Sequence, residues 1–217
     1  GSVKIGQIIG REKLKKFLEK IGVLSQLTFD IQETGKPLSF KWRNCKLKTV
    51  SYGHGITTTP IQLAKGYAIL ANGGYDIRPT LIKKEFYNFQ KNRILNKDVS
   101  SQINKIFRKV VTHGTATLSD VEGYEVGGKT GTAQIVENGV YTNKKINTFA
   151  SVFPSSDPRF VLVILLEDTK LSKNYIYKYR NKPGSFKGTP FNTAGWTSVE
   201  ITGKIIDKIG PILATKY

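Results

Sequence analysis

The sequence has little of what disulfide-rich and zinc-binding proteins need. Cys45 is the one cysteine among 217 residues, and there are two histidines. An intramolecular disulfide framework is therefore excluded, and a Cys/His zinc site is not expected. The sequence predicts neither a metal nor a cofactor.

Long apolar runs are also missing. The longest, residues 160–166, has seven residues, whereas a membrane helix needs about 20. No charged-then-apolar leader opens the chain, so neither a signal peptide nor a transmembrane segment is predicted, and we expect this chain by itself to be soluble. Its 39% hydrophobic and 11% aromatic residues are enough for a buried core.

Acidic residues are few, 16 Asp and Glu against 34 Lys and Arg, which gives 34 − 16 = +18. Such a charge favours anionic partners: nucleic acid, lipid headgroups or an acidic polymer. The lysines are scattered along the chain, however, which is typical of a dispersed, solvated surface. No RNA-binding aromatic motif, zinc finger or heptad array accompanies the charge, so nucleic-acid binding remains a minor alternative and is not expected.

The first half of the chain is predicted to be helical. Residues 11–21 place apolar side chains on one helical stripe, and Gly22 is a natural C-terminal stop. Residues 23–50 are turn-rich and are interpreted as an irregular connection. Threonine before Pro60 predicts the start of a helix that ends near residue 73. Another helix is expected over residues 98–111, and its apolar stripe is formed by Val99, Ile103, Phe107 and Val110.

The second half is predicted to be a sheet with one covering helix. Residues 127–136 are rich in β-branched residues, and the Asn138-Gly139 pair after them is a strong hairpin signal. Residues 147–153 and 160–167 are expected to be strands, the second covered on both faces because it is apolar almost throughout. A last helix is expected over residues 197–213. The fold class is therefore α+β, with an antiparallel sheet covered by helices.

Two motifs overlap at Lys129. Residues 123–130, GYEVGGKT, match the phosphate-binding loop G-x-x-x-x-G-K-[ST]. That loop needs a strand before it and a helix after it, and this sequence predicts neither. The nucleotide-binding interpretation is therefore disfavoured.

The competing interpretation takes Lys129-Thr130-Gly131-Thr132 as a strand in an acyl-transfer site. The lysine supplies positive charge beside a serine nucleophile, and the hydroxyl of Thr130 or Thr132 binds a substrate carboxylate. Gly131 and Gly128 let the backbone approach the ligand, although both could simply relieve crowding. An N–H group near Thr132 can serve as an oxyanion donor. Strict alternation puts Lys129 and Thr130 on opposite faces, so that both reach one ligand only if the strand twists.

Four ordered blocks surround this motif: SYGHGITTTPIQLA (51–64) followed by ANGG (71–74), HGTA (113–116), GGKTGTAQ (127–134) and NTFASVFP (147–154). In this order they resemble the class B penicillin-binding proteins, most closely the division-type, septal members. The resemblance implies a serine β-lactamase-like transpeptidase domain that cross-links peptidoglycan stem peptides and is acylated by β-lactams. It also implies a parent protein at the bacterial inner membrane, with this part on the periplasmic side and division proteins as partners.

The family's S-x-x-K nucleophile motif has no counterpart here, since no serine of this chain has lysine three positions later. Ser172-Lys173-Asn174 reads S-x-N, but it follows the K-T-G strand and is interpreted as a chance match. We therefore expect residues 1–217 to be a single partial domain, the C-terminal portion of the transpeptidase domain, with a helical region over about 3–111 and a sheet and helix over about 124–213. Such a chain should be inactive alone; a non-catalytic structural half-domain remains an alternative, and self-association through an open sheet edge is expected.

Overall fold

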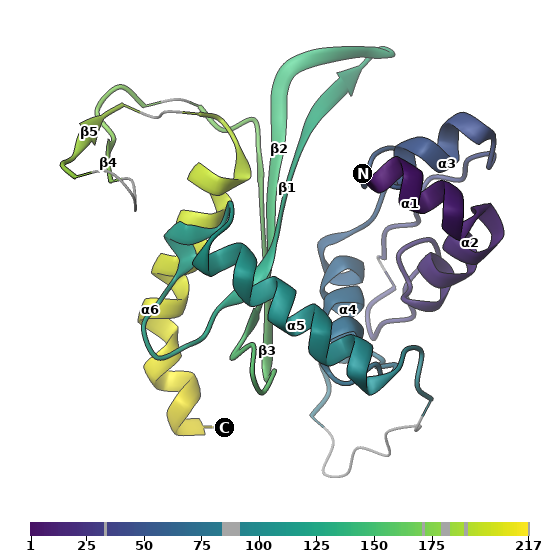
Figure 1. Cartoon of the computed structure of the whole chain (residues 1–217), viewed down its shortest axis with the longest axis horizontal. Helices are drawn as coiled ribbons and strands as arrows, with labels where there is room; N and C mark the ends of the chain where they lie inside the picture. Colours follow the sequence, from purple (N-terminus) through teal and green to yellow (C-terminus); the bar gives the residue numbers. More distant parts are fainter. Residues whose placement is uncertain (33, 84–91, 171, 179–182, 189–190, 217) are drawn as a thin grey trace. The chain divides into compact units, whose positions relative to one another are not determined.

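The computed structural model describes residues 1–32, 34–83, 92–170, 172–178, 183–188 and 191–216 (Figure 1). The chain divides into two compact units, Gly1–Ser100 and Ser101–Tyr217, each with its own hydrophobic cluster. The first unit contains α1 (Ser2–Ile9), α2 (Arg11–Lys20), α3 (Asn44–Val50), α4 (Pro60–Ala71) and the start of α5 (Lys97–Thr112). The second contains the rest of α5, η1 (Thr117–Ser119), β1 (Gly127–Glu137), β2 (Val140–Phe153), β3 (Phe160–Glu167), β4 (Ile176–Tyr177), β5 (Phe186–Lys187), η2 (Ala194–Trp196) and α6 (Ser198–Lys216).

Helix α4 begins where the sequence predicts, at a capping box. The Thr59 hydroxyl accepts from Gln62 N at 3.3 Å, and the Gln62 side-chain oxygen accepts from Thr59 N at 2.9 Å. The amide of the fully buried Gln62 also donates to Gly22 O at 3.3 Å. Gly22 itself has φ 84° just beyond α2, which confirms it as a helix stop. The cap thus joins α4 to the end of α2.

Two predictions in the first half need correction. Residues 44–50 form helix α3, so interpreting all of 23–50 as irregular is wrong. This helix has seven residues and no side-chain cap at Arg43, so it lacks the usual sequence signals. In α5, Val99 is 46% exposed while Ser100 is 1% exposed, so the predicted apolar stripe is displaced by one position there. The Ser100 hydroxyl takes the buried place because it donates to Leu70 O at 2.6 Å, satisfying a carbonyl in the last turn of α4.

The second unit is built on an antiparallel sheet in the order β1-β2-β3, which confirms the predicted α+β class. Asn138 and Gly139 form the β1–β2 turn with φ 52° and 80°, as the Asn-Gly signal predicts. Strand β2 begins at Val140, seven residues earlier than expected, because the long hairpin continues its pairing out to the turn (Figure 1). The register sets Thr132 opposite Asn147.

Strand β3 lies at one edge of this sheet. Helix α6 packs on β2 and β3, and the core between these elements includes Phe149, Val199 and Ile206, all fully buried. No residue of β3 is fully buried, and Leu165 is 43% exposed. The expectation that β3 is covered on both faces is therefore not met within this unit, where α6 is the helix that packs against it.

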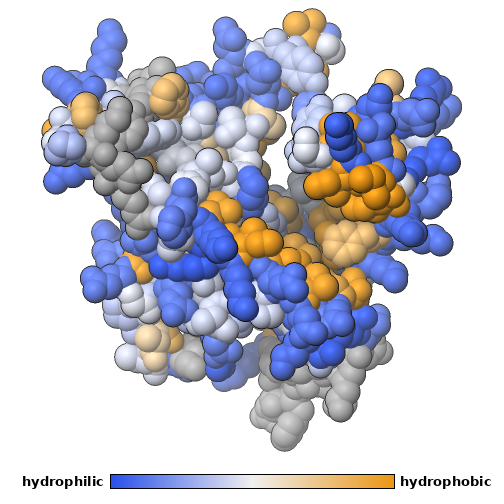
Figure 2. Space-filling model, viewed as in Figure 1, coloured by the Kyte–Doolittle hydropathy of each residue, from blue (hydrophilic) through white to orange (hydrophobic). Residues whose placement is uncertain are grey.

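Hydrophilic residues make up much of the surface. Figure 2, which is coloured by hydropathy, shows them over much of the face in view, with hydrophobic patches between them. None of the helices in the described residues has the length and apolar character needed to cross a bilayer. Across the same residues, no three His, Cys, Asp or Glu side chains come together as a metal site would require.

Candidate active site

The glycine-rich segment before Lys129 leads into a strand. Residues 127–137 are strand β1, and the residues just before them form η1 and a turn. A phosphate-binding loop needs a following helix whose N-terminal N–H groups point at the ligand. Residues 123–130 have no such helix after them, so the structure excludes the nucleotide-binding interpretation.

Thr130 and Thr132 lie on one face of β1 and line a groove of about 360 Å³ within the second unit. The other walls come from the turn after α5, from η1, from the residue after β4, and from η2 with the residue before it. Their lining residues are Gly114, Thr115, Thr117, Leu118, Lys178, Thr193, Gly195 and Trp196. Lys178 is the one charged residue among these described lining residues. Half of the ten lining residues are threonines, whose neutral hydroxyls suit recognition of an anion by hydrogen bonds.

Both threonine hydroxyls of β1 are held by residues outside the strand. Thr130 Oγ1 lies 2.8 Å from Thr115 Oγ1, and either oxygen can be the donor. Thr132 Oγ1 accepts a hydrogen bond from Ala194 N at 3.0 Å. These two bonds fix where the hydroxyls sit before any ligand arrives.

The other predicted site residues lie elsewhere on the strand. Lys129 is exposed, and its ammonium group donates to Thr130 O at 2.8 Å. Neither Lys129 nor Gly131 lines the groove, as strand alternation requires for side chains that point to the other face. Gly128 is buried, and its α-carbon faces the Ala150 carbonyl and the Phe149 ring. The structure thus brings Thr130 and Thr132 together and sets Lys129, Gly131 and Gly128 apart from them.

A buried polar network holds the segment that carries η2. Asn147 is fully buried, and its amide donates to Asn192 Oδ1 at 2.7 Å and to Thr169 Oγ1 at 2.9 Å. Asn192 in turn donates to Thr169 O at 2.8 Å. Because Asn192 is two residues before Ala194, this network fixes the backbone N–H that Thr132 accepts.

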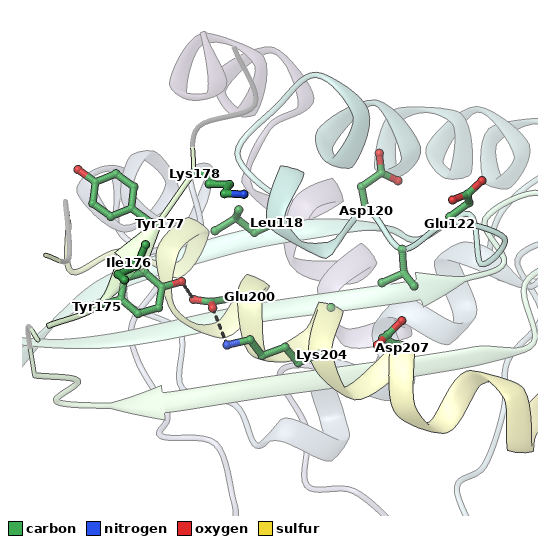
Figure 3. Close-up of a pocket in the computed structure, with 12 residues that line it drawn as sticks. Leu118, Asp120, Glu122, Tyr175, Ile176, Tyr177, Lys178, Glu200, Lys204 and Asp207 are labelled. Carbon is green, nitrogen blue, oxygen red and sulfur yellow. Dashed lines mark hydrogen bonds and ion pairs between the residues drawn. The ribbon is translucent and has the colours of Figure 1, made fainter. Parts of the chain in front are cut away.

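A second groove, of about 480 Å³, lies between β4 and α6 (Figure 3). Glu200 accepts hydrogen bonds there from the Tyr175 hydroxyl and from the Lys204 ammonium, the latter at 2.7 Å. Burial, together with the Glu200 carboxylate, raises the pKa of Tyr175. Tyr177 packs edge-on against Trp196, with ring centroids 5.2 Å apart. Strand β4 thereby packs against Trp196, a residue that lines the first groove.

Sequence reasoning missed several lining residues. Thr115 stands in the HGTA block but had no role assigned, and nothing in the sequence indicated Thr193, Trp196 or Lys178. The only available signal was the position of Thr115 within a block that resembles a known family. Its contact with Thr130 depends on tertiary structure.

Comparison with solved structures defines the class of fold. The transpeptidase domain of penicillin-binding protein 3 from Burkholderia pseudomallei superposes with a TM-score of 0.80 at 22% identity, over 98% of this chain and 61% of that one. Penicillin-binding protein 3 from Mycobacterium tuberculosis, solved in complex with aztreonam, gives 0.77 at 22% identity, over 96% and 49%. The fold is thus that of penicillin-binding transpeptidases.

The sequence comparison agrees with the fold. The family described as "Penicillin binding protein transpeptidase domain" matches residues 1–185, and the chain belongs to this family. The probable peptidoglycan D,D-transpeptidase FtsI of Caulobacter vibrioides is 28% identical over 229 residues, which cover all of this chain and 36% of that protein. The chain spans about a third of the length of this relative.

Proposed function

We propose that this chain forms the carboxylate-binding part of a serine-type peptidoglycan D,D-transpeptidase. The observation that carries the proposal is the pair of hydroxyls, Thr130 and Thr132, that line one groove beside the K-T-G-T strand. A carboxylate at the end of a stem peptide, or on a β-lactam, would accept hydrogen bonds from both. Membership of the transpeptidase family supports this substrate class.

In the proposed reaction, a serine outside these 217 residues attacks the carbonyl of the D-Ala–D-Ala bond. The terminal D-alanine leaves with a proton, and an ester forms on the serine. The amine of a neighbouring stem peptide then attacks the ester, which forms the cross-link and restores the hydroxyl. Lys129 lies outside the groove, so we propose that it acts on the developing anion through its positive charge rather than by contact within the groove, while the backbone N–H at Thr132 polarises the carbonyl.

The sheet offers a second feature that suits a peptide substrate. Among the described strands β1 pairs with β2 alone, so its outer edge is open beside the groove. An extended peptide can add to such an edge through backbone hydrogen bonds. Gly131 favours this arrangement, since the nearest atom to a side chain built there is Thr148 O at 4.0 Å. Gly128 is buried against the Ala150 carbonyl and the Phe149 ring, so the part that we propose for it in substrate binding is confined to its backbone.

The whole protein's setting belongs to the same proposal. We place it at the bacterial inner membrane, with this part on the periplasmic side and division proteins as partners. The support is the resemblance of the sequence blocks to septal penicillin-binding proteins, together with the similarity to a protein named as a probable peptidoglycan D,D-transpeptidase. By itself the chain would be inactive and prone to self-association through β3.

The test is β-lactam acylation of the full-length protein, followed by intact mass. Thr130→Val and Thr132→Val keep the side-chain shape and remove the hydroxyl, and each should lower the second-order acylation rate about 10–100-fold, as loss of a hydrogen bond to a charged group does. Thr142→Val is the matched control, because the Thr142 hydroxyl donates to Ile135 O at 3.0 Å in the distal hairpin and lies outside the groove. Unchanged rates in both groove variants would reject the proposal.

The 217-residue chain provides a second arm of the same experiment. It lacks S-x-x-K, so incubation with the same β-lactam should leave its mass unchanged. A stoichiometric adduct mapped to one of its serines would show that the nucleophile lies within these residues and would overturn the proposed division of roles.

A further inference from the structure

The hydrogen bonds around the groove determine which protons are available to a ligand. A threonine hydroxyl carries one proton and can accept through its oxygen. Thr132 Oγ1 accepts from the Ala194 backbone N–H at 3.0 Å, and a backbone N–H can only donate. Within the described part of the chain this is the hydrogen bond that Thr132 Oγ1 makes, so its own proton can be donated into the groove.

Thr130 is paired differently, with another hydroxyl. Thr115 Oγ1 and Thr130 Oγ1 are 2.8 Å apart, and the pair can be arranged in two directions. If Thr130 donates to Thr115, a carboxylate in the groove faces lone pairs of Thr130. If Thr115 donates to Thr130, the Thr130 proton is available to the carboxylate. An anion therefore favours the second direction, in which Thr130 and Thr132 both donate.

Thr115 is held in place by its backbone. Val110 O, near the end of α5, accepts from Gly114 N and from Ala116 N, both at 3.1 Å, and Ala116 is fully buried in the core. On the other side, a side chain built on Gly195 would lie 2.7 Å from Thr115 O, so η2 packs directly on the Thr115 backbone. The same η2 turn supplies the Ala194 N–H to Thr132.

We propose that Thr115 is a positioning residue that donates to Thr130 and so directs the Thr130 proton toward the bound carboxylate. This inference rests on the proposed function and deepens it. Accepting one hydrogen bond makes a hydroxyl a better donor of the next, so Thr115 strengthens the bond between Thr130 and the ligand. In this arrangement Thr115 donates to Thr130 in the same way as the Ala194 N–H donates to Thr132. Each strand hydroxyl accepts one hydrogen bond and keeps its own proton for the ligand.

The experiment compares benzylpenicillin with its methyl ester in the full-length protein. Thr115→Val should lower the acylation rate for benzylpenicillin about 3–10-fold, the effect of one neutral hydrogen bond. The ester keeps the ring system but lacks the charge that orients the hydroxyl pair, so its rate should change about 2-fold or less by the same reasoning. Thr115→Ser retains the donor and should restore the rate, while melting temperatures confirm that all variants fold.

A double-mutant cycle separates positioning from direct contact. If Thr115 acts through Thr130, then Thr115→Val should have no further effect in a Thr130→Val background. Additive effects would mean that Thr115 contacts the ligand itself and would overturn the inference. Equal losses for acid and ester would indicate structural damage and would also overturn it.

The outcomes also distinguish this inference from the function on which it rests. If the unmodified full-length protein is not acylated, the proposed function and this inference both fail. If Thr130→Val slows acylation while Thr115→Val leaves it unchanged, the proposed function stands and the role of Thr115 is rejected.

Discussion

Substitution by alanine should destabilise the fold at Gly128 and stabilise it at Gly131, although both glycines belong to strand β1. A side chain built on Gly128 would overlap the Ala150 carbonyl oxygen and lie 2.9 Å from two ring carbons of Phe149. Neither obstacle can move easily, since Ala150 belongs to the central strand β2 and Phe149 is fully buried in the core. At Gly131 the nearest such atom is Thr148 O at 4.0 Å, which is ordinary contact.

These distances give the expected magnitudes. Inserting a methyl group into a filled core costs typically about 1–3 kcal/mol, and the backbone obstacle at Gly128 places Gly128→Ala near the upper end, about 3 kcal/mol. For Gly131→Ala the unfolded chain loses freedom without a clash, which stabilises the fold by up to about 1 kcal/mol. In a domain of this size, about 2–4 °C of melting temperature corresponds to each kcal/mol, so Gly128→Ala should melt roughly 6–12 °C lower.

Urea unfolding of the two variants and the unmodified chain, followed by far-ultraviolet circular dichroism, measures the free energies. Equal destabilisation by the two substitutions, within about 0.5 kcal/mol, would refute the reasoning from these contacts.

Three further predictions concern charge and association. In the full-length protein Lys129→Ala should lower the acylation rate about 10²–10³-fold with the fold intact, as loss of one electrostatic element does; an unchanged rate would remove Lys129 from the site. Hydrogen bonds from Thr80 Oγ1 and Leu81 N hold the pKa of Asp30 below its ordinary value of 3.8. The resulting stabilisation is present above that value and is lost as the pH falls through the folded-state pKa, so an NMR titration should give a midpoint below 3.8, and a midpoint at or above it would contradict the contact. The 217-residue chain should self-associate through the open edge of β3 more strongly as salt screens its +18 charge, and light scattering should show Leu165→Lys to be more monomeric; a monomer at every salt concentration would rule this out.

Local chemistry explains which elements could be predicted from the sequence. The Asn138-Gly139 turn needs positive φ at both positions, and this pair supplies it more readily than others. The Thr59 cap is equally local, because its partner Gln62 is three residues away. Helix α3 escaped prediction because it has seven residues and no capping side chain. The buried position of Ser100 could not be inferred either, since it depends on a carbonyl of α4, 30 residues earlier.

In the candidate site, too, local features could be predicted from the sequence and distant contacts could not. The motif at residues 129–132 indicated which strand carries the hydroxyls, and alternation correctly separated Lys129 from Thr130. The partners of these hydroxyls lie far away in the sequence: Thr115 is 15 positions from Thr130, and Ala194 is 62 positions from Thr132. Such pairs form only after the sheet, η2 and the end of α5 have packed together, so no local pattern encodes them.

A short motif is a weak predictor of chemistry because it does not include the distant partners of its side chains. A threonine on a strand edge is equally able to accept or to donate, and only its partners determine which it does. Here Thr132 already accepts from the Ala194 N–H, so its own proton is available to a ligand, whereas the Thr115–Thr130 pair can be arranged in either direction. The network of Asn147, Asn192 and Thr169 then bears on the recognition that we propose, because it fixes the backbone that carries Ala194. The specificity for a carboxylate that we propose for the groove would therefore reside as much in the residues that orient the two hydroxyls as in the K-T-G-T motif.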